Sequence, residues 1–195
     1  MTLEEAISLV SYKLALKQGE KALEDPFLNP ADIHRALTDQ AKQCEEKVDI
    51  KAYMAATKML KQHKLDTFRE ENKTFLQQNA QGPEITTTPS GLQYKILREG
   101  SGSSPQASDS VTVHYKGSLI DGTEFDSSYT RGTPASFALN KVIPGWREAI
   151  LLMQEGAHYK LYLPQEIGYG ERGNDAKVPG YATLIFEVEL LKVEG

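Results

Sequence analysis

The stretch VIPGWREAI (Val142–Ile150) contains the only tryptophan of the 195-residue chain. Trp146 follows a Pro-Gly pair and stands where a short helix is expected to begin, because proline is favoured in the first turn of a helix. The largest aromatic side chain therefore lies at a junction between a turn and a helix. It can be a core residue or the floor of a pocket, and the surrounding sequence has to distinguish the two.

The sequence around this helix is typical of strands. Apolar and polar residues alternate in GLQYKILREG (91–100), VTVHYKGSL (111–119), HYKLYLP (158–164) and ATLIFEVELLKV (182–193). Several antiparallel strands with one short helix predict an α+β domain. We expect the sheet to wrap on the helix, which covers its apolar face.

The first half of the chain has a different composition. Residues 31–81 contain no glycine and no proline, whereas 13 of the 15 glycines follow Thr88. Three helices are expected here. Thr2 and Glu5 form a capping box for the first, Asn29 caps the second, and Asp49 caps a third that runs from about residue 50 to about residue 78.

These patterns predict an all-α domain at residues 1–81, a linker at 82–90 and a second domain at 91–195. The later part of the third helix has apolar residues only at Leu65, Phe68, Phe75 and Leu76. Such a narrow stripe cannot bury against a broad core, so we expect a mostly solvated spacer.

The first two helices have more apolar groups than a lone helical hairpin can bury. Examples are Ile7, Val10 and Leu14. A small helical unit usually needs a partner to fold. Burial favours a homodimer through residues 1–48 over the alternative, a self-contained bundle packed on the second half.

Composition excludes several classes of protein. The net charge is −5 and no basic stripe is present, so nucleic acid is not an expected partner. No apolar run reaches the roughly 18 residues of a membrane span.

The N-terminus does not look like a signal peptide, so a cytoplasmic location is expected, with a periplasmic or secreted location as the alternative if Met1 follows a removed leader. Cys44 is the only cysteine, lies in an acidic helical context and is not expected to be reactive.

The usual catalytic motifs are absent. His34, His63, His114 and His158 have no metal-ligand spacing, and FDSSY (125–129) lacks the surroundings of a serine nucleophile. No metal or cofactor is therefore expected. Aromatic residues instead gather at turns and strand ends, a placement typical of a concave apolar pocket. They are Tyr115, Phe125, Tyr129, Phe137, Trp146, Tyr169, Tyr181 and Phe186, of which we interpret Phe137 as a plain core residue.

The second half resembles the FKBP-type peptidyl-prolyl isomerases. The motifs that carry the resemblance are VTVHYKGSLIDGTEFDSS (111–128), VIPGW (142–146), IGYGERG (167–173) and ATLIFEVELL (182–191). They occur in the order of that family and lie within residues 91–193. The resemblance implies an FKBP-like fold and a peptidyl-prolyl cis-trans isomerase that needs no cofactor.

The first half is similar to the N-terminal dimerisation domain of the Mip-like bacterial subgroup of that family. The motifs here are SYKLALKQG (11–19), NPADIHRAL (29–37), FREENKTFLQQNA (68–80) and TTPSGLQYKIL (87–97). The resemblance implies a homodimer with chaperone-like holding of clients. Its implied partners are X-Pro peptides, unfolded or partly folded proteins, and macrolides such as tacrolimus and rapamycin.

The resemblance also implies the site. Trp146 is the floor under the substrate proline, and the Tyr169 hydroxyl and the Ile143 N–H are donors to peptide carbonyls. The implied catalytic residues are Tyr115, Phe125, Asp126, Trp146, Tyr169 and Phe186. The implied substrate-binding residues are Arg131, a partner of Asp126, together with Val142, Ile143 and Val178.

The flap GNDAKVPGYA (173–182) departs from the family pattern. Asn174 and Lys177 stand where other members have histidine or apolar residues, while Val178 keeps one apolar contact. This departure leaves a second hypothesis open, a proline-peptide-binding chaperone or scaffold with little turnover. An assay on a short X-Pro peptide distinguishes the two.

Overall fold

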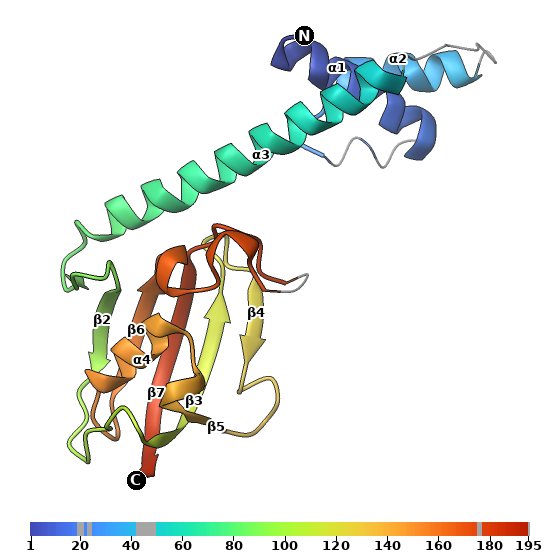
Figure 1. Cartoon of the computed structure of the whole chain (residues 1–195). Coiled ribbons are helices and arrows are strands. Elements are labelled where there is room, and N and C mark those ends of the chain that lie inside the picture. Colours follow the sequence, from blue (N-terminus) through green and yellow to red (C-terminus); the bar gives the residue numbers. More distant parts are fainter. Residues whose placement is uncertain (19–21, 23–24, 42–49, 175–176, 195) are drawn as a thin grey trace. The chain divides into compact units, whose positions relative to one another are not determined.

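The chain forms two compact units, Met1–Thr67 and Phe68–Gly195. The computed structural model describes residues 1–18, 22, 25–41, 50–174 and 177–194 (Figure 1). Helix α3 (Ile50–Asn79) contributes residues to both units. The domain limits expected from the sequence, 1–81 and 91–195 around a linker, stay a prediction about which parts fold independently.

The first unit consists of α1 (Leu3–Gln18), α2 (Pro30–Ala41) and the beginning of α3. Two of the three expected caps are present. The Glu5 N–H donates to Thr2 Oγ1 at 3.2 Å while the Thr2 N–H donates to Glu5 Oε2 at 2.7 Å, and the Ala31 N–H donates to Asn29 Oδ1 at 2.9 Å. The expected cap Asp49 and the single cysteine Cys44 lie outside the described residues.

The second unit is built on an antiparallel sheet. Its strands run in the order β1-β2-β6-β7-β3-β4, and β5 also pairs with β3. The strands are β1 (Thr86–Thr87), β2 (Gln93–Arg98), β3 (Ser110–Ser118), β4 (Glu124–Ser127), β5 (Ala135–Ala138), β6 (His158–Leu163) and β7 (Leu184–Glu194). The four segments that alternate in the sequence contain β2, β3, β6 and β7, which lie side by side in the middle of the sheet.

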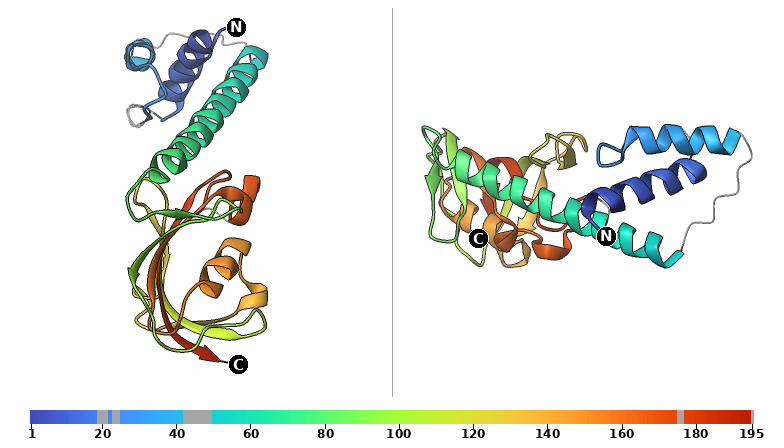
Figure 2. Two further views of the ribbon diagram at one scale, coloured as in Figure 1. Left: turned by 90° about the vertical axis from the view of Figure 1, so that its left-hand side faces the viewer. Right: turned by 90° about the horizontal axis from the view of Figure 1, so that it is seen from above.

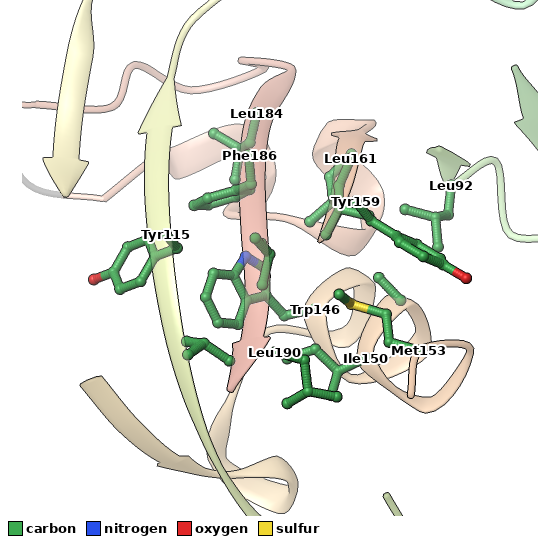
Figure 3. Close-up of a cluster of buried hydrophobic side chains, with 14 of the residues drawn as sticks. Leu92, Tyr115, Trp146, Ile150, Met153, Tyr159, Leu161, Leu184, Phe186 and Leu190 are labelled. Carbon is green, nitrogen blue, oxygen red and sulfur yellow. The ribbon is translucent and has the colours of Figure 1, made fainter. Parts of the chain in front are cut away.

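Helix α4 (Pro144–Leu151) lies on the concave side of this sheet (Figure 2). Its buried face includes Trp146, Ala149 and Ile150, which pack on strand residues such as Leu161 and Val188. Figure 3 shows this cluster between the helix and the strands. The predicted fold class, an α-helical N-terminal part followed by a sheet wrapped on one short helix, is confirmed. Short 3₁₀ turns η2 (Leu139–Lys141), η3 (Gln165–Ile167) and η4 (Gly170–Arg172) connect its elements.

The later part of α3 differs from the expected solvated spacer. Phe68 packs on the core of the second unit, and the Phe75 ring lies 6.1 Å from the Tyr162 ring. Asn72 is only 3% exposed. Hydrophobic periodicity does not detect this buried face of α3, because one of its most buried residues is the polar Asn72. None of the helices in the described part of the chain combines the length and apolar character of a membrane span.

The core of the second unit predicts a contrast between two leucines. Leu161 is fully buried in β6, whereas Leu191 in β7 is 36% exposed. Leu161→Ala is expected to lower the free energy of unfolding by about 2–5 kcal/mol, because it leaves a cavity. Leu191→Ala is expected to change it by less than about 0.5 kcal/mol. Urea unfolding followed by Trp146 emission measures both, and equal losses would contradict the described core.

Candidate active site

A cavity of about 690 Å³ opens above the start of α4. This volume lies within the range of small-ligand sites. The residues that line it come from β3, β4, β5, η2, α4, β7 and the segment before β7. They are Tyr115, Phe125, Asp126, Phe137, Lys141, Val142, Ile143, Trp146, Tyr169, Asn174, Lys177, Val178 and Phe186.

The floor of the cavity is the Trp146 ring. Its centroid lies 5.1 Å from the Tyr115 ring, 5.2 Å from Phe186 and 5.5 Å from Phe137, with interplanar angles between 81° and 89°. These are favourable edge-to-face contacts, and they fix the indole from three sides. Figure 3 shows the ring directed from α4 toward β3 and β7.

Gly145 allows the indole to reach this position. A Cβ atom at residue 145 would lie 2.6 Å from Leu163 Cδ2, so only glycine lets the start of α4 approach β6 this closely. Pro144 stands at the first helical position, where no N–H is needed. The sequence Pro144-Gly145-Trp146 therefore places tryptophan at the start of the helix, because the helix has to begin in close contact with the sheet.

Phe125 and Phe186 form one wall. Their rings are 5.5 Å apart and perpendicular. Gly117 of β3 lies opposite Phe186 of β7 and opposite Asp126 of β4. A Cβ atom at residue 117 would be 2.7 Å from both phenylalanine rings, so the absence of a side chain makes room for the wall.

The polar side of the cavity is a closed network of three residues. The Tyr115 hydroxyl donates to Asp126 Oδ2, and Arg131 forms an ion pair with Asp126. Arg131 Nη2 also donates to the Tyr115 hydroxyl at 2.8 Å. Ser128 holds the neighbouring backbone, because the Tyr115 N–H donates to its hydroxyl at 2.8 Å. The Ser128 hydroxyl is therefore engaged with the backbone of β3.

This network moves two pKa values away from neutrality. Burial alone would raise the pKa of Asp126, but hydrogen bonds from Tyr115 and Arg131 outweigh burial and lower it. Burial raises the pKa of Tyr115, and its hydrogen bond to the Asp126 carboxylate raises it further. The carboxylate therefore stays charged and the phenol stays neutral across the physiological range.

The opposite side consists of Ile143, Tyr169 and Val178. Val178 is 2% exposed and contacts the aromatic cluster. The Tyr169 hydroxyl makes no hydrogen bond to any described residue, so it is available to a ligand. Asn174 and Lys177 form the rim.

Nine of the ten site residues predicted from the sequence line this one cavity. Arg131 is the exception among them, since it lies behind Asp126 and acts on the cavity through that carboxylate. The interpretation of Phe137 as a plain core residue was wrong, because β5 brings its ring beside Trp146 on the cavity wall. Lys141 also lines the cavity but was not predicted from the sequence, where its only signal is its position directly before Val142.

Two family models match the chain. Residues 101–191 match FKBP-type peptidyl-prolyl cis-trans isomerase, and residues 8–96 match the domain amino terminal to FKBP-type peptidyl-prolyl isomerase. The chain belongs to the FKBP-type peptidyl-prolyl cis-trans isomerases. The resemblance inferred from the sequence is therefore confirmed.

Relatives of this isomerase extend over both halves of the chain. It is 42% identical over 165 residues to the FKBP-type 22 kDa peptidyl-prolyl cis-trans isomerase of Escherichia coli K12, a match that covers 84% of this chain and 74% of the relative. FkpA of Aeromonas hydrophila is 41% identical over 177 residues, which are 86% of this chain and 66% of that protein. The crystal structure of FkpA from Escherichia coli has a TM-score of 0.68 at 36% identity and covers 93% of this chain and 89% of that one.

The expected cytoplasmic location of this isomerase is contradicted by one of its relatives. The protein of Legionella longbeachae that bears the name Outer membrane protein MIP is 46% identical over 129 residues, 64% of this chain and 55% of that protein. The prediction rested only on the absence of leader features at the N-terminus. That absence does not determine a compartment, so the prediction was wrong.

The charges of the network predict a pH profile for the isomerase. Asp126 and Tyr115 titrate below and above neutrality, so kcat/KM on an X-Pro peptide is expected to be flat between about pH 6 and 8. A protease-free assay avoids the pH dependence of a coupling enzyme. A rate that rises or falls with pH between 6 and 7 would instead show that a group outside this network takes part.

The same network predicts how stability depends on pH. Because the folded-state pKa of Asp126 is lowered, its pairing stabilises the fold above the pKa of an unfolded aspartate, about 3.9. This contribution is lost as the pH falls through the folded-state value.

Proposed function

We propose that this isomerase rotates X-Pro peptide bonds of folding proteins in the cavity above Trp146. The observation that carries the proposal is the combination of an aromatic floor, fixed by three nearly perpendicular rings, with a paired carboxylate on one side and, on the other, a tyrosine hydroxyl that is free among the described residues. A proline ring fits such a concave apolar site, and the peptide carbonyls on either side need donors.

The proposed chemistry needs neither a nucleophile nor a base. Rotation about a peptide bond faces a barrier of about 18–20 kcal/mol, and no bond breaks. The planar amide is polar through resonance, whereas the twisted transition state is less polar. An apolar site disfavours the planar form relative to the twisted one, and each 1.36 kcal/mol of this difference is about tenfold in rate.

The residues have distinct roles in this proposal. Trp146 supports the proline ring, and Phe125 and Phe186 confine it. The Tyr169 hydroxyl and the Ile143 N–H donate to the peptide carbonyls. Asp126 stays charged and fixed by Arg131, so it orients the twisted amide without exchanging a proton.

Macrolides that mimic proline are proposed to bind the same floor. Trp146 is the only tryptophan, so all indole emission reports on this site. Tacrolimus is expected to change that emission saturably, and an X-Pro peptide is expected to compete weakly because it loses more conformational freedom on binding.

Phe125→Ala and Asp126→Ala test the site directly. Each is expected to lower kcat/KM on a short X-Pro peptide by at least about tenfold, since each removes one wall or charge of the cavity. Phe27→Ala, at a half-buried phenylalanine of the first unit that does not line the cavity, is the matched control and is expected to keep wild-type turnover. Wild-type activity in both site variants would refute the assignment. Binding without measurable turnover in the unsubstituted protein would favour the alternative, a proline-peptide-binding chaperone.

We also propose that the chain is a homodimer through residues 1–48 that holds client proteins. In the described part of the first unit, Ile7, Leu9 and Leu14 of α1 remain only partly buried on the single chain. A second copy that covers these groups would remove apolar area from water. Residues 42–48 of the proposed interface lie outside the described residues.

Light scattering tests the dimer. The full chain is expected to have twice the 21.7 kDa of one chain, and Leu9→Lys is expected to shift it toward the monomer by placing a charge in the interface. Glu4→Lys, at an exposed position of the same helix, controls for the added charge. A monomer at micromolar concentration would contradict the proposal.

The holding of clients is tested separately. If the dimer holds clients, Leu9→Lys is expected to slow the refolding of a protein whose folding is limited by proline isomerisation, but not the turnover of a short peptide.

A further inference from the structure

Asn72 is a buried polar residue in the part of α3 that belongs to the second unit. It is 3% exposed, and both ends of its amide are used. Asn72 Nδ2 donates to the Phe68 carbonyl at 2.8 Å, and Asn72 Oδ1 accepts the Thr183 N–H at 2.7 Å. Thr183 is 1% exposed and stands directly before β7, so its N–H lies outside the strand ladder. An aliphatic residue at position 72 would leave this donor without its partner.

A second contact from α3 reaches the same segment two residues earlier. The Arg69 guanidinium lies 5.0 Å from the centre of the Tyr181 ring. Tyr181 has a φ of 65°, a left-handed conformation that is unfavourable for an aromatic residue, and its N–H donates to the Gly170 carbonyl at 3.0 Å. Such a conformation persists only where surrounding contacts hold it.

The described residues of the segment from Tyr169 to Thr183, which are 169–174 and 177–183, fold tightly on each other. Asn174 and Val178 exchange backbone hydrogen bonds of 2.9 and 3.2 Å. A Cβ atom at Gly180 would lie 1.9 Å from the Glu171 carbonyl oxygen, so the two sides of the segment are in direct contact. A displacement at Tyr181 or Thr183 is therefore transmitted to the rest of the segment.

This segment also forms one wall of the cavity. Tyr169 and Val178 line the cavity from it, and Asn174 and Lys177 form the rim. The helix and the ligand thus contact one compact segment from different sides. The geometry points to Asn72, assisted by Arg69, as a positioning residue that holds the Tyr169–Thr183 segment where Val178 and the Tyr169 hydroxyl meet the ligand.

This inference rests on the proposed function of the cavity and adds the last turns of α3 to the isomerase unit. The sequence placed the isomerase domain at residues 91–195, which lacks both contacts. Asn72 touches neither the floor nor the polar network, so its loss is expected to weaken ligand binding and raise KM more than it lowers kcat.

Asn72→Ala in the full chain is the principal test. Its affinity for tacrolimus, measured by Trp146 emission, is expected to fall about three- to tenfold, the equivalent of one lost hydrogen bond. Its KM for an X-Pro peptide is expected to rise by a similar factor. Hydrogen exchange under native conditions is expected to accelerate at amides in 170–174 and 177–183 and not in β3, which a general loss of stability would not produce.

Three further variants make the result specific. Asn72→Asp keeps an acceptor for the Thr183 N–H but places its second carboxylate oxygen against the Phe68 carbonyl, so it is expected to restore only part of the affinity. Gln77→Ala, at an exposed position on the same helix, is expected to behave as wild type. Arg69→Ala removes only the exposed contact with Tyr181, so it is expected to fold and to accelerate exchange in the same segment by a smaller factor. It provides the readout if Asn72→Ala does not fold.

Wild-type affinity, KM and exchange in a folded Asn72→Ala, or in Arg69→Ala if the first variant is unfolded, would overturn the inference. The proposed function is tested separately by Phe125→Ala. If Phe125→Ala loses binding while Asn72→Ala keeps it, the cavity assignment stands and the positioning role fails. If Phe125→Ala retains wild-type binding, the cavity assignment itself fails, whatever the result at Asn72.

Discussion

The edge-to-face packing of Trp146 on Tyr115, Phe137 and Phe186 is the contact on which the rest of the site depends. It requires α4 to approach the concave sheet closely, which Gly145 permits by leaving Leu163 unobstructed. It also requires strands from both ends of the second half to be neighbours, and the β3–β7 pairing supplies this. Trp146 therefore belongs both to the core of the unit and to the floor of its cavity. A substitution that shifts the core packing is expected to shift the floor of the cavity as well.

The polar network extends the same arrangement. Tyr115 contributes its ring to the wall beside Trp146 and its hydroxyl to Asp126, so the position of the carboxylate is tied to the packing of the aromatic cluster. Arg131 compensates the charge of Asp126 at the edge of the cavity. A carboxylate that is paired on two sides is a fixed negative charge rather than a base, which agrees with a reaction in which no proton has to move.

Much of this could be predicted from the sequence because it follows local rules. Strand alternation located the central strands, capping residues located α1 and α2, and Pro144-Gly145 located α4. Two features of the fold and the site were predicted wrongly. Phe137 was placed in the core because alternation in a strand does not show which end of a buried face remains open to ligand. The later part of α3 was placed in solvent because Asn72 is polar, and hydrophobic periodicity detects a buried face only when apolar residues form it.

The buried asparagine matters because of the kind of reaction that we propose for the cavity. An enzyme that works through a nucleophile can tolerate some loosening around the reacting atoms if the reactive group is intact. An isomerase that favours a twisted amide by shape and polarity has no such group, so its selectivity for the transition state depends on how firmly each wall is held. Trp146 is held by rings and Asp126 by Arg131, whereas the Tyr169–Thr183 segment includes a strained residue and a backbone donor outside the sheet. In the proposed arrangement, the contacts from Asn72 and Arg69 of α3 hold that wall in place, as the aromatic cluster holds the floor.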